Sequence, residues 1–493
     1  MLGNYNLMLY AILIPILASP IAYLFGRRIG RTWNGILATV ALGISTGLLF
    51  TYWGRVLFKG AVTESYGIWI GLFKLDMSFL MDHLSLAISL LIAGISTLAA
   101  IYSITYMAHE HDQEIYFACL LLFVGGMIGV VLASNLILFY LFWEMMLIPS
   151  YFLIAYWGTG RPKVIGFKYF MFTHAGAACL FFGILWVYAL TGTFNLSQLS
   201  EALHTVPVDV LRWIMVLMFI GFAVKLAIFP VHTWLPDAHA EAPTPISVLL
   251  SGVMIKCGAY AMARITLTLF PATLISVSYG LMILAIITML WGGIMAFAQT
   301  DIKRLLAYSS ISQAGYILFG LMSLYTLGIT GGLFHIINHG IAKALLFMCA
   351  GAIIYSTGIR DIRKLGGLAG KMPITAVAVL CGALSIAGTP PLGGFASEWM
   401  IFAGAFEAGF VLLGALAIIA TIVTVGYYLR MIKRVFFGRC PRNLDGVKEV
   451  PAYMLVPMCV LTFFTIVFGI FAFAPLDVIY PAAESISKLF IGG

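Results

Sequence analysis

The chain has 493 residues, of which 62% are hydrophobic and only 9% are charged. Soluble domains carry about 25% charged and 45–50% apolar residues, so this composition excludes an ordinary soluble enzyme and favours a polytopic membrane protein. The net charge of +8 is not gathered in any long basic or polar segment, which excludes nucleic-acid binding and extended disorder.

Motifs for bound cofactors are missing from the sequence. Neither a Walker A motif nor a G-x-G-x-x-G between a strand and a helix is present. The seven cysteines form no C-x-x-C pair and mostly lie in apolar runs, so we interpret them as packing residues rather than disulfides or iron–sulfur ligands. We therefore expect neither a cofactor nor a metal in this chain.

Fourteen apolar segments are long enough to cross a bilayer. Their predicted bounds are 8–26, 33–54, 80–106, 114–133, 135–157, 165–190, 211–240, 244–269, 274–298, 303–326, 329–355, 373–409, 411–434 and 453–474. Residues 56–79 alternate loosely and hold β-branched and aromatic residues, which predicts a short surface β-hairpin. The N-terminus lacks a basic region followed by a cleavage site, so we expect a retained first helix. We predict an all-α polytopic fold in a single membrane domain over 1–493.

Basic residues are distributed unevenly between the two sides of these spans. Loops that leave odd-numbered spans carry 18 Lys and Arg residues, and the opposite side carries six. Because positively charged loops stay in the cytoplasm, this bias predicts that both termini lie outside. The six residues on the outer side are Arg55, Lys59, Lys74, Arg212, Arg264 and Lys488.

Five charged residues fall inside the spans, namely Glu144, Lys225, Lys256, Lys343 and Glu398. One charge at the bilayer centre costs about 2.5–3.5 kcal/mol on the insertion scale, so such groups face the bundle interior and mark ion or proton paths. Buried salt bridges that lock helices together are the alternative. Three cations and two anions cannot all pair, and histidines join them, which favours a proton path.

Two spans contain helix-breaking residues. Pro230 and Pro236 interrupt the seventh span just after Lys225, and the sequence GTPPLGG, with Pro390, interrupts the twelfth just before Glu398. Interrupted helices at corresponding places in two halves are typical of inverted repeats around a transport site. The predicted parts are an N-terminal region over 1–110, two inverted five-span repeats over 114–269 and 274–434, and a C-terminal loop and span over 435–493.

A row of titratable residues follows the eleventh span. His335, His339 and Lys343 recur at every fourth position, so successive members are rotated by about 40° and the row climbs about 12 Å along one helix face. Such a row suits proton hopping through intervening waters. His174 stands alone in the sixth span, where a satisfied core histidine is an equal alternative.

Several polar residues surround the turn after the seventh span. They can cap or solvate this turn, and their spacing does not fit a metal site. These residues are His232, Asp237, His239 and Glu241.

Three segments resemble signatures of the antiporter-like subunits of respiratory complex I. FAVKLAIFPVHTWLPDAHAEAPTPISVLLSGVMIKCGAY resembles the first broken helix and its successor, DIKRLLAYSSISQAGYILFG the start of the tenth helix, and GTPPLGGFASEWMIF the second broken helix. The resemblance covers at least residues 80–435. The family includes chains L, M and N of NADH:quinone oxidoreductase, multi-subunit Na⁺/H⁺ antiporters, membrane-bound hydrogenases and archaeal deazaflavin-cofactor dehydrogenases.

Within that family, an acid after the second break is typical of chain M (subunit 4). Glu398, the length and the number of spans therefore favour a resemblance to chain M. Lys343 is more typical of the antiporters and of the sister chains, so an antiporter or hydrogenase subunit stays open.

The resemblance implies a proton-translocating, non-redox subunit of a complex I-type NADH:quinone oxidoreductase, a translocase that is inactive alone. Glu144 would pair with Lys225, whose proton affinity would change with their separation. Lys256 would relay protons through the centre, and Glu398 would end the exit half-channel. The supporting residues would be His335, His339, His232, Pro230 and Pro390.

The same resemblance implies where the protein works. Flavin, iron–sulfur clusters and quinone would reside in partner subunits, and the partners would be other membrane-arm subunits in a prokaryotic cell membrane. One component of a multi-subunit Na⁺/H⁺ antiporter or of an ion-pumping membrane-bound hydrogenase is the alternative.

Overall fold

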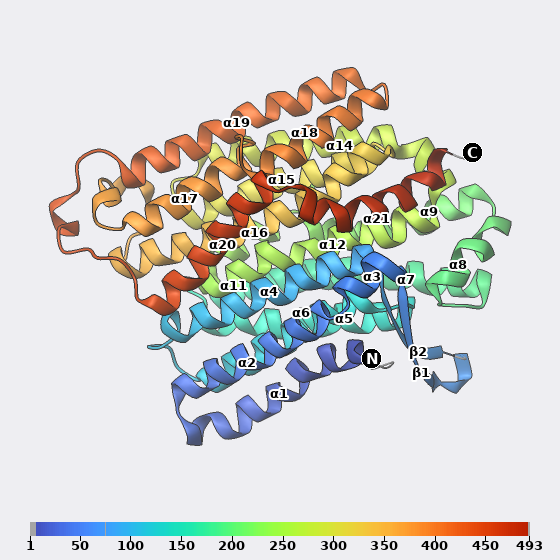
Figure 1. Cartoon of the computed structure of the whole chain (residues 1–493), viewed down its shortest axis with the longest axis horizontal. Helices are drawn as coiled ribbons and strands as arrows, with labels where there is room; N and C mark the ends of the chain where they lie inside the picture. Colours follow the sequence, from blue (N-terminus) through green and yellow to red (C-terminus); the bar gives the residue numbers. More distant parts are fainter. Residues whose placement is uncertain (1–5, 74, 492–493) are drawn as a thin grey trace.

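The computed structural model describes residues 6–73 and 75–491, which form a bundle of long helices lying side by side (Figure 1). Within these residues, twelve helical spans are long and apolar enough to cross a membrane. Eleven of them are α1 (Leu7–Ile29), α2 (Arg31–Phe50), α4 (His83–Tyr106), α5 (Gln113–Leu132), α6 (Leu136–Trp157), α7 (Pro162–Thr191), α14 (Pro271–Ala298), α15 (Ile302–Met322), α16 (Thr326–Thr357), α19 (Val411–Phe436) and α20 (Ala452–Ile470).

The twelfth span, Thr244–Leu269, is one helix with two widened turns. π-Helical segments at Leu250–Met254 (η3) and Met262–Thr266 (η4) join its α-helical pieces. Those pieces are α11 (Thr244–Leu249), α12 (Ile255–Ala261) and α13 (Leu267–Leu269). The sequence predicted the span but not the widened turns.

Two further crossings are interrupted, as predicted. One consists of α9 (Val208–Leu226) and α10 (Trp234–Glu241), and the other of α17 (Pro373–Ile386) and α18 (Gly393–Glu407). Together with the twelve spans they confirm fourteen crossings in the described chain. The inverted relation of the two halves and the predicted domain bounds stay predictions.

The two breaks share their local chemistry. In the first break, Ala227 follows α9 with a φ of 63°. In the second break, Gly388 lies just before Pro390 and Pro391 and has a φ of 64°. A cis peptide bond follows in each break, at Phe229–Pro230 and at Pro390–Pro391. Backbone groups freed by such breaks need other partners, and the indole of Trp234 supplies one by donating to the carbonyl oxygen of Val224 at 2.9 Å.

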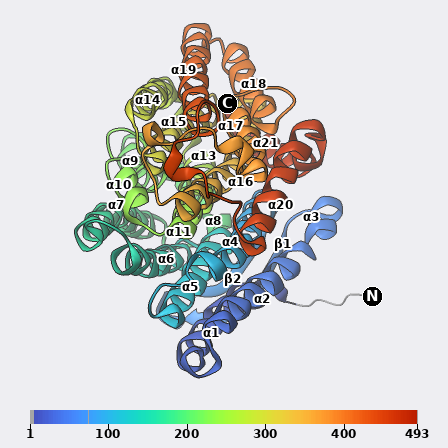
Figure 2. The same ribbon diagram turned by 90° about the vertical axis from the view of Figure 1, so that its left-hand side faces the viewer.

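The centre of the bundle is formed by the Thr244–Leu269 helix and α16. The most apolar stretches of both helices are 100% buried. In Figure 2, α1 and α2 lie at one edge of the bundle, and α18 and α19 lie at the opposite edge. Large apolar side chains such as Leu141, Ile148 and Phe152 are exposed on the outside, as expected for a surface that faces lipid or a neighbouring subunit.

The predicted hairpin is confirmed with shifted bounds. β1 (Val62–Ile70) pairs antiparallel with β2 (Leu75–Met81), and Val62 lies opposite Met81. Residues 56–59 belong instead to a short helix, α3 (Trp53–Lys59), in which Val56 is buried. Glu64 fastens the hairpin to α1 by accepting hydrogen bonds from the backbone N–H groups of Leu7 and Met8, both at 3.1 Å.

Polar caps fix where several helices begin. Asp82 accepts from the N–H of Ser85 at 2.9 Å, so α4 begins at His83 and not at residue 80, which still belongs to β2. Asp301 caps α15 in the same way by accepting from the N–H groups of Lys303 and Arg304.

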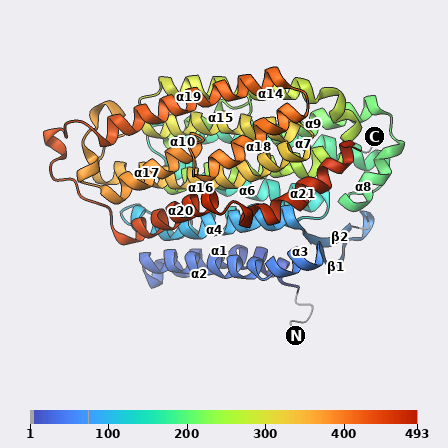
Figure 3. The ribbon, with the colours of Figure 1, turned by 45° about the horizontal axis from the view of Figure 1, so that its top comes forward.

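The sequence did not predict α21 (Phe473–Ile491), which follows α20 in the same direction through the bundle (Figures 1 and 3). Asp477, Glu484 and Lys488 lower its hydropathy below that of a spanning segment. The start of α1 and the end of α21 lie at the same end of the bundle as the hairpin (Figure 1). Minor elements are α8 (Leu196–Ala202) and 3₁₀ turns at Gly71–Phe73, Leu203–Thr205, Ile362–Lys364, Leu368–Gly370 and Arg442–Leu444.

Candidate functional site

Glu144 and Lys225 are close in the bundle but do not form the predicted direct pair. The carboxylate of Glu144 lies 3.4 Å from Nδ1 of His174 and accepts from the hydroxyl of Tyr140 at 3.2 Å. Lys225 is buried on α9, with its Nζ 5.5 Å from the ring centre of Trp143. The described structure holds no direct ion pair between them, because the Glu144 carboxylate turns toward His174 on α7 and Lys225 is buried against Trp143.

His174 lies beside Glu144 and is not a buried core histidine. Its side chain is 51% exposed on α7, and its ring stacks on Phe170 with centres 5.4 Å apart. A half-exposed imidazole beside a carboxylate, on an otherwise apolar face, marks a surface that another polar group can reach.

Lys256 lies at the centre of the bundle. Its Nζ donates to the carbonyl oxygen of Ser251 at 2.9 Å and lies 2.5 Å from Nδ1 of His339. The same helix packs tightly on the end of α9, since a Cβ on Gly258 would lie 2.9 Å from the backbone nitrogen of Leu226. The lysine is thus one helix away from Lys225 and in contact with α16.

The histidine row continues from Lys256 along α16. The rings of His339 and His335 are nearly parallel, with centres 5.9 Å apart. His335 then contacts two other helices, because Nε2 lies 2.6 Å from Oε1 of Gln313 on α15 and Nδ1 lies 3.0 Å from Oγ of Ser397 on α18. The predicted shared face of the two histidines is confirmed, and the row ends beside the residue that precedes Glu398.

Lys343 shares that helix face but turns to a different set of partners. Its Nζ donates to the carbonyl oxygen of Leu306 and to the hydroxyl of Tyr428, both at 3.0 Å, and it contacts Oγ of Ser309. The residue is fully buried between α15, α16 and α19. Lys343 therefore extends the polar interior toward α19 and does not contact His339 directly among the described residues.

Glu398 is buried on α18, directly after the second break. Its Oε1 has no hydrogen-bond partner among the described residues. Gly388 makes room for it, since a Cβ at that position would collide with Oε2 of Glu398. The glycine at the break thus has two roles, a left-handed backbone and close approach to a buried carboxyl group.

The polar residues after the first break divide into two groups. Asp237 pairs with Lys168 on α7 at 2.7 Å and with Arg304 on α15 at 3.0 Å, which is a structural role. His232 accepts from the indole N–H of Trp291 at 3.0 Å, next to Pro230. Neither ring nitrogen of the fully buried His239 has a partner in the described chain.

Glu241 accepts from the backbone N–H of Arg161 at 3.0 Å, so its carboxylate binds the start of α7 and not the turn after the seventh span that the sequence suggested. In residues 6–73 and 75–491, no group of three or more His, Cys, Asp or Glu side chains could hold a metal ion.

The buried lysines share one property. None of Lys225, Lys256 and Lys343 has a carboxylate oxygen within 4.0 Å in the described structure. Lys303 is a fourth lysine of this kind. It is buried, and its Nζ donates to the carbonyl oxygen of Ala242. Their partners are carbonyl, hydroxyl, imidazole and aromatic groups, which accept an ammonium and tolerate a neutral amine.

Comparison with known proteins decides the family. The family model described as "NADH:quinone oxidoreductase/Mrp antiporter, TM" matches residues 133–424, which is more than half of the chain. The chain belongs to this family. A second model, described as "NADH-Ubiquinone oxidoreductase (complex I), chain 5 N-terminus", matches residues 68–117.

Curated relatives of this antiporter-like chain are components of Na⁺/H⁺ antiporters. It is 36% identical to an Na⁺/H⁺ antiporter subunit from Alkalihalophilus pseudofirmus over 97% of this chain and 62% of that protein. It is 33% identical to an Na⁺/H⁺ antiporter subunit from Staphylococcus aureus over 99% of this chain and 64% of that protein. The chain thus spans less than two thirds of the length of these relatives.

Solved structures show the same fold in three kinds of assembly. A chain of the Mrp complex from Dietzia sp. superposes with a TM-score of 0.90 at 24% identity, covering 99% of this chain and 97% of that chain. A chain of the archaeal membrane-bound sulfane sulfur reductase superposes with a TM-score of 0.86 at 30% identity, covering 94% of this chain and 76% of that chain. A chain of respiratory complex I from Thermus thermophilus superposes with a TM-score of 0.88 at 26% identity, covering 98% of this chain and 99% of that chain.

The antiporter-like resemblance is therefore confirmed, the chain has a multi-pass membrane fold, and its homologues are subunits of multi-subunit assemblies. The finer resemblance to chain M, inferred from Glu398, stays a prediction. Sequence reasoning missed Gln313 and Ser397, and the signal available for both was a polar residue within an apolar helix. It assigned Arg264 to the outer side, and the structure places this residue within the Thr244–Leu269 helix, at the hairpin end of the bundle.

Proposed function

We propose that this chain translocates protons across the membrane as the antiporter-like subunit of a larger complex. The observation that carries the proposal is the buried contact series from Lys256 through His339 and His335 to Ser397, beside Glu398. Every member can bind or release a proton or donate a hydrogen bond, and the series crosses three helices. The chain supplies the path, and partner subunits supply the driving reaction.

For the assembly, we propose a multi-subunit Na⁺/H⁺ antiporter of the Mrp type. The two antiporter relatives support this, together with Lys343 in α16, which resembles the antiporter pattern. A complex I-type NADH:quinone oxidoreductase, or a related redox-driven complex, is the second candidate. It is supported by Glu398, an acid at the position typical of chain M, and by the fold shared with complex I.

Membrane vesicles that hold the intact assembly distinguish these functions. For the antiporter, adding Na⁺ to energised vesicles should release the pH gradient, and Lys256→Met should abolish this release. For the redox-driven complex, NADH or another electron donor should create a pH gradient in the absence of Na⁺. Wild-type vesicles in which neither Na⁺ nor any donor moves protons would refute proton translocation.

A further inference from the structure

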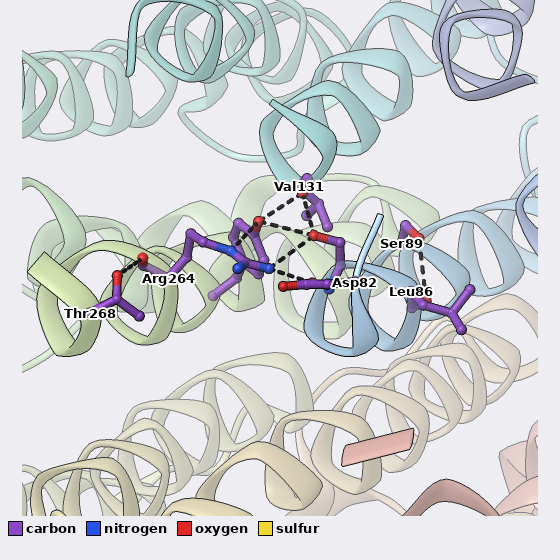
Figure 4. Close-up of polar contacts among 8 residues, drawn as sticks. Asp82, Leu86, Ser89, Val131, Arg264 and Thr268 are labelled. Carbon is purple, nitrogen blue, oxygen red and sulfur yellow. Dashed lines mark hydrogen bonds and ion pairs between the residues drawn. The ribbon is translucent and has the colours of Figure 1, made fainter. Parts of the chain in front are cut away.

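A polar cluster joins the Thr244–Leu269 helix to the start of α4 at the hairpin end of the bundle (Figure 4). Nη2 of Arg264 lies 2.5 Å from Oδ1 of Asp82 and donates to Oγ of Ser85 at 3.1 Å. Nε of Arg264 donates to the hydroxyl of Tyr260 at 3.1 Å, and this hydroxyl donates to the carbonyl oxygen of Val131 at 2.7 Å. One guanidinium thus ties α4 and α5 to its own helix.

This cluster lies in line with the central lysine. Lys256, Tyr260 and Arg264 follow one another at four-residue spacing, so they share a helix face and rise about 12 Å toward the hairpin end. The π-helical segments η3 and η4 lie on either side of Lys256, and Arg264 belongs to η4. Such widened turns are frequent at functional sites.

Helix α4 presents hydroxyl groups along the same stretch. Ser85, Ser89 and Ser96 are buried and lie within about 40° of one another around the helix axis. Ser85 and Ser89 lie on the hairpin side of Lys256, whereas Ser96 lies beyond it, near the level of Gly252, and its Oγ has no hydrogen-bond partner among the described residues. A hydroxyl-lined face can hold water where an all-apolar face cannot.

The two helices run antiparallel, which sets the level of each serine. A Cβ on Gly252 would lie 3.6 Å from Ile95, while Arg264 meets Asp82 at the other end. By interpolation, Ser89 lies at a level between Lys256 and Tyr260. The side chains of Asp82 and Arg264 are 23% and 13% exposed, so they form the last layer before the surface.

We infer that the Asp82–Arg264 ion pair closes a hydroxyl-lined route for water and protons between Lys256 and the hairpin end of the bundle. Arginine keeps its charge, and Asp82 is held in place as the cap of α4, so the closure is formed by two fixed charges. Separating the charges gives water access to the serine row. The inference rests on the proposed role of Lys256, but access can be measured without transport.

The test measures the rate at which a membrane-impermeant thiol reagent labels Ser89→Cys in membranes that contain the intact assembly. Peptide mass spectrometry reads residue 89 separately from the native cysteines. Thr63→Cys on the exposed face of β1 identifies the hairpin side and gives the rate for full access. Ser89→Cys should react slowly, and adding Asp82→Asn or Arg264→Gln should speed its labelling at least tenfold.

Asp301→Asn is the matched control. Asp301 also caps a helix and pairs with an arginine, since Nε of Arg360 lies 2.9 Å from Oδ2, and asparagine preserves the cap in both variants. The control should leave the labelling of Ser89→Cys unchanged. The inference is overturned if neither pair variant changes the rate, if Asp301→Asn raises it equally, or if residue 89 already reacts fast with the pair intact. Failure of both pair variants to reach the membrane would make the pair a folding tie and would overturn it too.

Discussion

Replacing Lys256 tests whether the buried row carries protons or only holds helices together. Lys256→Met removes the donor to the carbonyl oxygen of Ser251 and the partner of His339. Leaving two buried polar groups unpaired costs about 2–6 kcal/mol in total. Removing a charge from the centre of the membrane returns about 2.5–3.5 kcal/mol. These opposing effects nearly cancel, so we expect the variant to assemble normally.

Transport should respond very differently from assembly. Without a protonatable group between Lys225 and His339, the rate of proton translocation should fall at least tenfold. Lys256→Arg sharpens the test, because arginine keeps the charge but does not release its proton at physiological pH. It should assemble and transport as poorly as Lys256→Met.

The assay is dye-monitored proton movement in vesicles, with the amount of assembled complex measured by native gel. Lys488→Met is the control, since Lys488 is exposed on α21 and, in the described part of the chain, pairs with Glu484 alone. It should change neither quantity. If Lys256→Arg transports at the wild-type rate, or if Lys256→Met loses assembly and transport in proportion, the central proton path is refuted in favour of a structural lysine.

Three further predictions concern other parts of the chain. Lys225→Ala should assemble normally and lose most transport. A double-mutant cycle of Glu144→Gln and His174→Gln should give a coupling free energy for stability of about 0–1 kcal/mol, because that pair is partly exposed. A larger coupling of Glu144 to Lys225 would show that the described conformation is not the working one. Gly388→Ala should lower the free energy of unfolding by about 1–3 kcal/mol and reduce transport, because φ of Gly388 is positive and Glu398 fills the space that a Cβ would need. Gly370→Ala is the control, since a Cβ there would meet nothing within 4 Å, and it should change neither stability nor transport. Reporters fused to the two ends of the chain should both be active outside the cell; a cytoplasmic reporter at either end would show a miscounted crossing.

The sequence predicted the crossings well because hydropathy is decided within each segment. Fourteen apolar runs became fourteen crossings, and the proline and glycine clusters became the two breaks. Predictions failed where a segment depends on its neighbours. α21 carries charges that hydropathy penalises, yet it packs against α4 and α16.

Contacts between distant spans were harder to predict than the spans themselves. Spacing placed His335 and His339 on one face, and the structure agrees. It did not show which way Lys343 and Glu144 would turn, since side-chain direction is set by the helices packed around them. Nor did it show what Arg264 would contact. Only the fold brings Asp82, 182 residues away in sequence, into contact with it.

The charged groups of the molecule divide by depth, and the division follows from what each must do. Near the two ends of the bundle, carboxylates face cations, as in Asp82 with Arg264, Asp237 with Lys168 and Asp301 with Arg360. Such pairs keep both charges and hold helices in register.

In the interior, the lysines contact neutral acceptors instead, such as the carbonyl oxygens of Ser251 and Leu306. A lysine bound to a carboxylate leaves an uncompensated anion when it loses its proton, which is expensive in a low dielectric. A lysine bound to a carbonyl leaves only a weaker hydrogen bond, so both protonation states are accessible. The carbonyl group of Ser251 belongs to the widened turn η3, so under the proposed function this turn would help the helix bundle to pass a proton through its centre.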